Sequence, residues 1–219
     1  MTRLIVMAKY PEPGAVKTRL ARVLGADNAC ALYRAFVLDL AGRLDNLPYA
    51  VTWAYWPPTA PFQGLVRGGR YRPQEGGNLG ERMAKALAEE FAEHGGPILV
   101  IGADAPHLPA ARLAEAAAAL AGGADVVLGP SADGGYYLIG LRGPAPGLFS
   151  DIPWSTARVL GTTRERAAAL GLGVHLLPPG FDLDEPADLA RLEGLLARGE
   201  VDLPRTATLL AARRFACRS

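Results

Sequence analysis

Short, almost uninterrupted apolar segments alternate along the chain with longer stretches of helical periodicity, and this alternation restricts the fold more than any other feature. The apolar segments are residues 3–8 (RLIVMA), 51–55 (VTWAY), 97–102 (PILVIG), 125–130 (DVVLGP) and 136–141 (YYLIGL). A strand that is apolar on both faces must be covered on both faces, which is typical of parallel sheets between layers of helices. The pattern therefore predicts an α/β fold with a mostly parallel central sheet. Residues 65–71 and 174–178 predict two weaker strands.

Helical segments are predicted between and after these strands. They cover residues 18–24, 27–46, 78–95, 109–123, 156–170, 186–198 and 205–217. Asn78 and Glu81 form the pattern of a capped helix start, and Gly95 is the expected stop. Pro109 and Pro186 each stand at a predicted first helical position, where the missing N–H of proline costs nothing. No repeat or linker divides the chain, so residues 1–219 are expected to form one domain.

The composition excludes several classes of protein. Half of the 219 residues are hydrophobic, so a core can form without disulfides. The 23 basic and 22 acidic residues nearly cancel, which argues against a disordered chain and against nucleic-acid binding by bulk charge. Cys30 and Cys217 are too few for a disulfide framework, and a reducing, cytoplasmic location is expected. The sequence shows neither a signal-peptide core nor an apolar run free of prolines that could span a membrane.

Several common active-site patterns are incomplete in this sequence. No G-x-G-x-x-G follows the first predicted strand, and Val16 stands where a Walker A motif needs glycine before Lys17. Asp133 stands where a serine hydrolase would need the second glycine of the motif around Ser131. The histidines lack the spacing of a zinc site and are expected to be ordinary surface or buried residues: His94, His107 and His175.

The loop after the first strand, residues 8–20 (AKYPEPGAVKTRL), concentrates positive charge at the carboxyl edge of the predicted sheet. Lys9, Lys17 and Arg19 supply three cations, and Gly14 lets the backbone come close to a ligand. Open α/β sheets bind ligands at this edge, so the loop is predicted to hold the phosphates of a nucleotide. The alternative is a proline-stiffened surface loop with solvated cations.

Three aspartates are expected at the same edge. Asp104 follows the strand at 97–102 and either holds Mg²⁺ or Mn²⁺ or organises the turn before a proline. Asp133 follows the strand at 125–130; it either orients or deprotonates an acceptor hydroxyl or shapes an Asp-Gly turn. Asp184 is either a helix cap or a second metal ligand. Cations for a diphosphate and carboxylates for a metal ion are together what a metal–nucleotide complex requires.

Six longer motifs occur in an order that resembles one bacterial family. They are AKYPEPGAVKTRLARVLG, GNLGERM, IGADAPHL, GPSADGGYYLIGL, IPWST and DLDEPADL, spread from about residue 3 to residue 195. By these motifs the chain is identified as a member of the glycosyltransferase-A-like family labelled radical-SAM/selenodomain-associated transferase 1. The resemblance implies the nucleotide-diphospho-sugar transferase fold, a three-layer α/β sandwich with a mostly parallel central sheet.

The resemblance also implies roles for individual residues. The residues assigned to the nucleotide are Lys9, Gly14, Lys17 and Arg19. The residues assigned to the metal ion are Asp104 and Asp184. The catalytic candidates are Asp133 and Lys17, and the acceptor candidates are Gly134, Gly135 and Tyr136. Because Tyr136 and Tyr137 alternate along a strand, at most one of them is expected to face a ligand.

The sequence departs from the family pattern at a few positions. Asn78 stands where the family usually has aspartate, and Ala105 and His107 replace residues that are typically cysteine and aspartate. Fewer carboxylates predict a reduced metal affinity. Glu185 replaces the usual threonine before Pro186, which predicts a weaker helix cap.

The leading hypothesis is a metal-dependent transferase with Mg²⁺ or Mn²⁺ as cofactor, specifically a glycosyltransferase with a nucleotide-sugar donor and a small-molecule acceptor. One alternative is guanylyl or cytidylyl transfer to a phosphorylated acceptor, with release of pyrophosphate. Another is a nucleotide-binding module without catalysis. Trp154, Ser155 and Thr156 would close the acceptor side, unless the tryptophan is simply buried.

Overall fold

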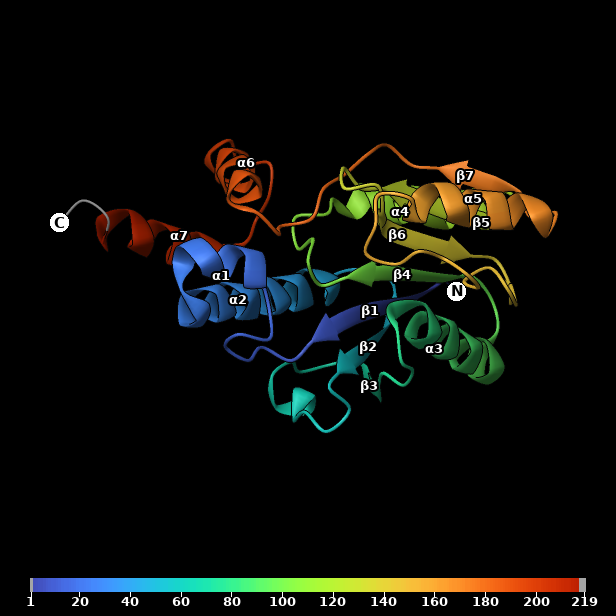
Figure 1. Ribbon diagram of the computed structural model, residues 1–219, viewed down its shortest axis with the longest axis horizontal. Helices are drawn as coiled ribbons and strands as arrows, with labels where there is room; N and C mark the ends of the chain where they lie inside the picture. Colours follow the sequence, from blue (N-terminus) through green and yellow to red (C-terminus); the bar gives the residue numbers. More distant parts are fainter. Residues whose placement is uncertain (1, 217–219) are drawn as a thin grey trace.

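Within the described part of the chain, seven strands form one twisted central sheet (Figure 1). The computed structural model describes residues 2–216, with side chains for residues 2–212. The strands are β1 (Arg3–Lys9), β2 (Ala50–Trp56), β3 (Arg70–Pro73), β4 (Ile98–Gly102), β5 (Val126–Pro130), β6 (Tyr136–Leu141) and β7 (Val174–Leu176). Their order across the sheet is β3-β2-β1-β4-β6-β5-β7. β6 runs antiparallel to both of its neighbours, and the other pairs are parallel.

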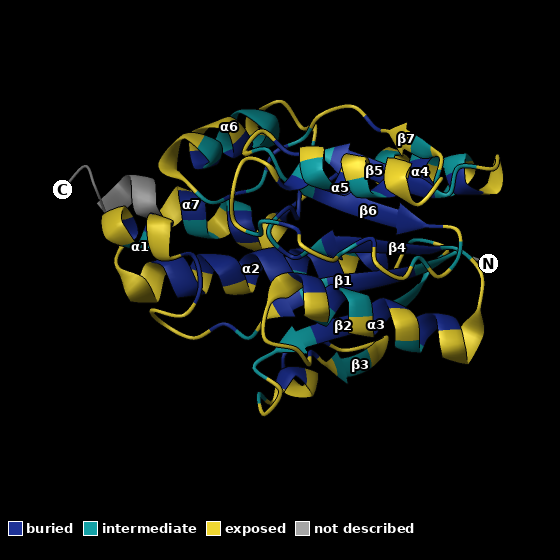
Figure 2. Cartoon of the chain, turned by 45° about the vertical axis from the view of Figure 1, so that its right-hand side comes forward, coloured by how far each residue is buried: buried dark blue, intermediate teal, exposed yellow. Residues whose placement is uncertain are grey.

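Helices cover both faces of this sheet. One face packs against a buried cluster that includes α1 (Thr18–Leu24), α2 (Ala26–Leu44), α4 (Ala110–Ala121), α6 (Pro186–Ala197) and α7 (Pro204–Ala216). The other face packs against α3 (Leu79–His94) and α5 (Val159–Ala169). Figure 2 shows largely buried strands at the centre and exposed outer faces on the helices. The three layers confirm the predicted α/β sandwich with a mostly parallel sheet.

The strand β4 shows why the apolar pattern requires two helical layers. Leu99 and Ile101 lie in the cluster with α2 and α4, whereas Ile98 and Val100 lie in the cluster with α3. All four are at most 3% exposed. Successive side chains of a strand point to opposite faces, so a strand without polar residues is stable only when both faces are covered.

The antiparallel strand β6 follows from the length of the turn before it. Residues 131–135 join β5 to β6, and this turn is closed by a hydrogen bond from the Ser131 amide to the Gly135 carbonyl oxygen (3.0 Å). A parallel neighbour would need a crossover of a dozen or more residues. The short turn therefore sends β6 back along β5, so β6 begins at the edge where β5 ends.

Several predicted boundaries are wrong by one to five residues, among them the starts of β3, α4 and α5. β3 starts only at Arg70, because Gly68 and Gly69 before it have φ angles of 88° and 81° and turn the chain. α4 starts after Pro109, whose backbone is extended rather than helical. α5 starts at Val159, because residues 156–158 form a turn that precedes it.

Other predicted helix ends are confirmed. The Asn78 side chain accepts a hydrogen bond from the Glu81 amide (3.0 Å) at the start of α3, and Gly95 ends that helix. α7 confirms the predicted C-terminal helix, although Cys217 lies outside the described residues. Among the described helices, none combines the length and the apolar character needed to cross a membrane.

Candidate functional site

The carboxyl ends of β1, β4 and β5 meet at one edge of the sheet, and predicted site residues follow each end. Lys9 is the last residue of β1, Asp104 comes shortly after β4, and Asp133 comes shortly after β5. In Figure 1 the arrowheads of β1 and β4 point toward this edge, where α1 and α6 also lie. Ligands of open α/β sheets bind at such an edge, because parallel strands end there side by side.

The segment between β7 and α6 returns along this edge. The Gly180 amide donates a hydrogen bond to the Pro130 carbonyl oxygen (2.8 Å), next to the end of β5. The Leu183 amide donates one to the Asp104 carbonyl oxygen (3.1 Å), just after β4. These two bonds bring a late part of the sequence against residues that follow earlier strands.

Lys17 is the buried centre of the site. It stands before α1 in the left-handed conformation (φ 48°, ψ 44°), and its side chain is 2% exposed. Its Nζ contacts a carboxylate oxygen of Asp104 and lies 2.8 Å from Oδ1 of Asp184. The same Nζ lies 5.7 Å from the centroid of the Tyr33 ring. The structure thus joins three residues that the sequence analysis assigned to one site: Lys17, Asp104 and Asp184.

Opposite charges decide the protonation of this group. Burial alone would lower the pKa of Lys17, but the charges and hydrogen bonds of Asp104 and Asp184 outweigh it, and the pKa is raised. Burial alone would raise the pKa of Asp184, but Lys17 outweighs it, and this pKa is lowered. At neutral pH the site therefore holds the Lys17 ammonium next to the Asp184 carboxylate.

Asp182 is a further carboxyl group at this site, and the sequence analysis missed it. Its Oδ2 accepts a hydrogen bond from the Ser131 hydroxyl (3.1 Å). Burial and, after it, the negative charge of Asp104 raise the pKa of Asp182 to about 7. The available signal was the alternation of apolar and acidic residues over 181–184, which puts both aspartates on one side of an extended chain. The Lys17 site, as we call it, consists of Lys17, Asp104, Asp182 and Asp184.

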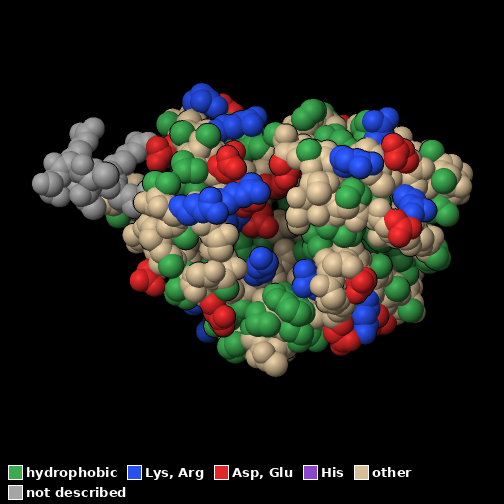
Figure 3. Space-filling model, viewed as in Figure 1, with side chains coloured by type: hydrophobic (Ala, Val, Ile, Leu, Met, Phe, Trp, Pro, Cys, Tyr) green, Lys and Arg blue, Asp and Glu red, His purple; other side chains and the backbone are tan. Residues whose placement is uncertain are grey.

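The other predicted cations surround the Lys17 site. Arg19 is largely exposed and pairs with Glu185, its Nη1 lying 3.3 Å from a carboxylate oxygen. Lys9 is exposed, and the charges of Lys9 and Arg19 add to that of Lys17 in lowering the pKa of Asp184. Figure 3 shows acidic side chains around a hollow near the centre of this face, with basic side chains beside them.

Gly14 lies in the same loop as these cations. Its φ angle is 80°, and no atom would lie within 4 Å of an added Cβ. The backbone conformation, rather than close packing, therefore favours glycine here. Its predicted contact with a nucleotide stays a prediction.

Asp133 is exposed and organises the turn between β5 and β6. Its Oδ1 accepts a hydrogen bond from the Gly135 amide (2.9 Å). Gly134 has a φ angle of 87°, and a Cβ at this position would overlap the backbone of Ala157. The turn explanation therefore has direct support, while the predicted roles of Asp133, Gly134 and Gly135 toward an acceptor stay predictions.

Tyr136 lies on the face of the sheet that carries α3 and α5. Its ring centroid is 6.4 Å from that of Trp154, with the rings nearly perpendicular. Its hydroxyl oxygen is buried, and burial raises the pKa of the phenol. Tyr137 lies in the cluster on the opposite face, where its hydroxyl donates to the Pro178 carbonyl oxygen (3.0 Å). The expected alternation is confirmed, and the acceptor role of Tyr136 stays a prediction.

His107 packs behind the segment that carries Asp182 and Asp184. It is 6% exposed, and its ring centroid lies 4.1 Å from that of Phe181. Burial, aided by the charge of Arg43, lowers the pKa of His107 to about 4. A neutral imidazole therefore supports the acidic segment at neutral pH.

A capping box of Glu185, the N-cap, and Asp188 closes the start of α6. Oδ2 of Asp188 accepts hydrogen bonds from the amides of Asp184 (3.1 Å) and Glu185 (2.8 Å). The interpretation of Asp184 as a side-chain cap is therefore wrong, because its carboxylate faces Lys17. The weaker cap expected from Glu185 is offset by Asp188, which holds the chain just before the helix.

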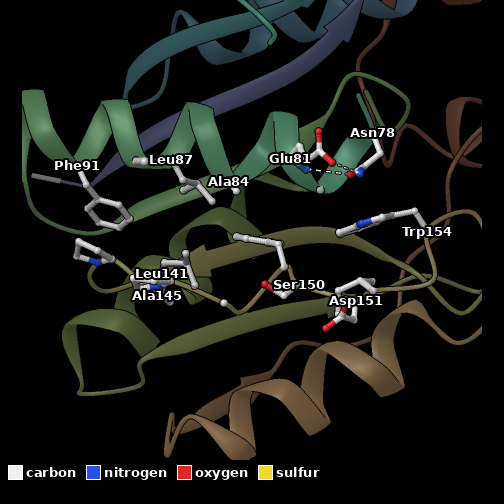
Figure 4. Close-up of a pocket in the computed structure, with 17 residues that line it drawn as sticks. Asn78, Glu81, Ala84, Leu87, Phe91, Leu141, Ala145, Ser150, Asp151 and Trp154 are labelled. Carbon is white, nitrogen blue, oxygen red and sulfur yellow. Dashed lines mark hydrogen bonds between the residues drawn. The ribbon is translucent and has the colours of Figure 1, made fainter. Parts of the chain in front are cut away.

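A separate pocket of about 700 Å³ lies between α3 and the segment after β6. Figure 4 shows Trp154 at the same end as Asn78 and Glu81, and Phe91 at the far end. A Cβ on Gly80 would overlap the Trp154 indole, so glycine is required where the helix meets this ring. The Lys17 site is not part of the lining. Because Trp154 also packs on Tyr136 at the start of β6, this end lies near the carboxyl edge.

Known proteins resemble this chain in sequence and in fold. The family model described as "Uncharacterized protein conserved in bacteria (DUF2064)" matches residues 38–156. A crystal structure from Desulfovibrio desulfuricans G20, described as that of a "putative nucleotide-diphospho-sugar transferase", is 34% identical with a TM-score of 0.87, and the match covers 99% of this chain and 96% of that one. A search of the curated proteins found no match.

More distant structures share the fold alone. A cytidylyltransferase from Leptospira borgpetersenii serovar Hardjo-bovis is 11% identical with a TM-score of 0.59, over 98% of this chain and 94% of that one. The CMP:2-keto-3-deoxy-manno-octonic acid synthetase complexed with CTP is 12% identical with a TM-score of 0.57, over 90% and 99%. The Desulfovibrio structure confirms the nucleotide-diphospho-sugar transferase fold predicted from the motifs.

Proposed function

The chain belongs to the bacterial family that the DUF2064 model describes, and we propose that it is a transferase that uses a nucleotide-activated donor. Specifically, we propose glycosyl transfer from a nucleotide sugar, with Mg²⁺ or Mn²⁺ as cofactor. The observation that carries the proposal is the convergence of Lys17 with Asp104 and Asp184 at the carboxyl edge of the sheet. A relative that covers nearly the whole chain, with the description "putative nucleotide-diphospho-sugar transferase", supports it.

The donor phosphates would be held by the loop between β1 and α1. Lys17 offers a compact ammonium with three donors, and Arg19 offers a planar guanidinium that can bind two oxygens at once. Lys9 adds a third positive charge at the end of β1. A diphosphate placed here would bring its negative charges to the cations that already lower the pKa of Asp184.

The residues present fit a hard divalent ion. Asp104 and Asp184 offer carboxylate oxygens, the ligands that Mg²⁺ prefers, and both already share one cation, the Lys17 ammonium. Among the described residues, no cluster of three or more acidic, histidine or cysteine side chains has the geometry of a metal site. Mg²⁺ is commonly held by one or two carboxylates together with substrate phosphates. When bound, the ion would neutralise charge that develops on the leaving diphosphate.

The proposed reaction joins an acceptor hydroxyl to the sugar. A bond forms between the acceptor oxygen and the anomeric carbon, and the bond from that carbon to the diphosphate oxygen breaks with its electron pair going to the diphosphate. The hydroxyl proton passes to a carboxylate, for which Asp133 is the candidate. Lys17 and Arg19 would stabilise the departing diphosphate.

The acceptor would approach from the side of Trp154. The predicted acceptor residue Tyr136 packs on Trp154, which is also a wall of the 700 Å³ pocket. A pocket of this size can bury a small molecule. We therefore assign the acceptor to this side of the edge and the donor to the side of Lys17.

Nucleotidyl transfer is a second candidate, and the hydrogen bond that Asp133 accepts from the Gly135 amide favours it. In that reaction an acceptor phosphate attacks the α-phosphate of a nucleoside triphosphate, and pyrophosphate leaves. A phosphate nucleophile is already ionised and needs no general base, so Asp133 would serve the turn alone.

The released species separates the two candidates. The protein is incubated with Mg²⁺ or Mn²⁺, a mixture of candidate acceptors, and separate panels of nucleotide sugars and nucleoside triphosphates. Release of a nucleoside diphosphate from a sugar donor, lost in Asp104→Asn, is the expected result. Release of pyrophosphate would contradict glycosyl transfer. Turnover that survives unchanged in Asp104→Asn would contradict the assignment of Asp104.

A further inference from the structure

Lys17 occupies the place between the two carboxylates that a metal ion would need. Its side chain is 2% exposed, whereas those of Asp104 and Asp184 are 46% and 47% exposed. The ammonium therefore reaches the carboxylates from the protein interior, while their outer sides face solvent. A divalent ion arriving from solvent would meet carboxylates whose negative charge is already partly neutralised.

From this arrangement we infer that Lys17 is a resident cation of the metal site, which keeps divalent ions weakly bound until a nucleotide arrives. The inference deepens the proposed function and rests on it. With a nucleotide present, its phosphates give the Lys17 ammonium new anionic partners. Asp104 and Asp184 are then released to a metal ion, which the same phosphates help to hold. Metal and nucleotide would accordingly bind as a pair.

The surroundings of Lys17 limit which anionic groups its ammonium can contact. Its ammonium lies beside the Tyr33 ring, and the Tyr33 hydroxyl accepts a hydrogen bond from the Lys9 amide (2.9 Å). The ring is therefore anchored to the end of β1 and closes the site on that side. With this side closed, the ammonium can change partners only toward the solvent-facing side, where phosphates would bind.

The charges around the site favour an exchange of partners by Lys17 over the simple addition of a metal ion. Asp182 adds a third carboxyl group near Asp104, and Lys9 and Arg19 stand around the rim. A metal ion added beside an unmoved Lys17 would be repelled by that ammonium. A nucleotide diphosphate brings negative charge that compensates both cations, so it converts repulsion into joint binding.

The test measures Mn²⁺ binding directly, without turnover. Free Mn²⁺ is followed by electron paramagnetic resonance during titration of the full-length protein, alone and with UDP, GDP or CDP. Wild-type protein is expected to bind Mn²⁺ weakly alone and about tenfold or more tightly with a diphosphate that it accepts. Lys17→Met is expected to bind Mn²⁺ alone about tenfold more tightly than wild type, with little further gain from the nucleotide.

The chain has three lysines, and Lys85, which lies outside the proposed site, offers a matched control. Lys85→Met removes the same charge from an exposed residue that pairs with Glu75, so its Mn²⁺ affinity should equal that of wild type. Lys17→Gln is the second variant if Lys17→Met fails to fold, because it keeps a polar, uncharged side chain. Thermal melting verifies that each variant is folded.

The outcomes for the two proposals can be distinguished. If Lys17→Met and Lys17→Gln bind Mn²⁺ alone no better than wild type, while a nucleotide still promotes Mn²⁺ binding to wild type, the resident-cation inference is wrong and the proposed donor use survives. If the variants bind Mn²⁺ more tightly but no nucleotide affects wild type, Lys17 does compete with the metal ion, but the joint binding of metal and nucleotide and the proposed donor use are both wrong.

Discussion

At the scale of single residues, Lys17 combines two costly features in one place. A residue other than glycine in the left-handed conformation costs roughly 1–2 kcal/mol, and a buried ammonium requires compensating charge. Both costs are accepted here, since Asp104 and Asp184 receive the ammonium on one side and Tyr33 lies on another. Backbone strain of this kind gathers at functional sites, which agrees with a role for Lys17 in binding.

Asp182 gives the site a dependence of stability on pH. Its pKa is raised to about 7 in the folded protein, against about 4 in an unfolded chain. The folded state therefore holds this proton more tightly, and stability from Asp182 is present at low pH and lost as pH rises from about 4 to about 7.

Asp182→Asn removes this loss, because the amide stays neutral and its oxygen can still accept the Ser131 hydroxyl. We expect the gain in stability over wild type to be about 3 kcal/mol larger at pH 8 than at pH 5, because only about a third of the loss has occurred in wild type by pH 5. Urea unfolding in metal-free buffer at both values measures the difference. Asp27→Asn, at the exposed start of α2, is the control. It should change the free energy of unfolding by the same amount at pH 5 and at pH 8. Equal effects of Asp182→Asn at pH 5 and pH 8 would contradict the shifted pKa.

At the scale of elements, the turn between β5 and β6 is locked to the chain just before α5. Gly134 closely approaches Ala157, and the Leu160 amide donates to the Gly134 carbonyl oxygen (2.9 Å). The turn that carries Asp133 and the segment that carries Trp154 are therefore held together. This contact holds together the two segments that carry the predicted acceptor residues.

Gly134→Ala tests this lock. The added methyl group would overlap the Ala157 backbone at a positive φ angle, so we expect a loss of about 2 kcal/mol or more in unfolding free energy. Gly161→Ala in α5 is the matched control, because open space surrounds that position. Alanine inside the helix should stabilise the protein by about 0.5–1 kcal/mol. Chemical denaturation of both variants compares them, and a Gly134→Ala protein as stable as wild type would contradict the lock.

At the scale of the whole molecule, the Lys17 site ties distant parts of the chain together. Lys17 and Asp184 are 167 residues apart in sequence, and the site also joins residues that follow β4 and β5. A ligand bound there contacts the folded chain at several points that separate on unfolding. Binding at the site should therefore raise the stability of the molecule as a whole.

A thermal-shift experiment tests this expectation. A nucleoside diphosphate with Mn²⁺ at about 100 times its Kd should add about 2.7 kcal/mol, which corresponds to a rise of roughly 5–10 °C in Tm for a chain of this size. Asp104→Asn should lose the Mn²⁺-dependent part of the shift. Asp202→Asn, at an exposed position, should keep it. A full shift in Asp104→Asn would mean that the ligand binds elsewhere.

The sequence predicts the layers of the fold and much of the site for identifiable reasons. β4 is apolar without interruption, so its burial on both faces follows from its residues, and Asp104 follows at its end. The motifs around Lys17 and Asp184 assign both to one site, and the structure joins them. Their direct ion pair was not predicted, because it depends on how the loop before α1 and the segment before α6 meet in three dimensions.

Two further features escaped the sequence for physical reasons. Asp182 differs from its neighbour Asp184 by burial and by its distance from Lys17, and neither quantity is visible in an alternating pattern. The pocket beside α3 arises between elements that are each unremarkable alone, a helix and an irregular segment. Trp154 was named among the residues closing the acceptor side, but its contact with Gly80 is apparent only once the helix is in place.

The contacts of Gly80 with Trp154 and of Gly134 with Ala157 anchor one end of the irregular stretch that follows β6, and the sheet anchors the other. Residues 143–153 therefore form an irregular segment that is held at both ends. Under the proposed function, changes within this segment would alter acceptor binding and leave the residues around Lys17 in place. A chimera that carries the corresponding stretch of a relative is therefore a way to change which acceptor the protein uses.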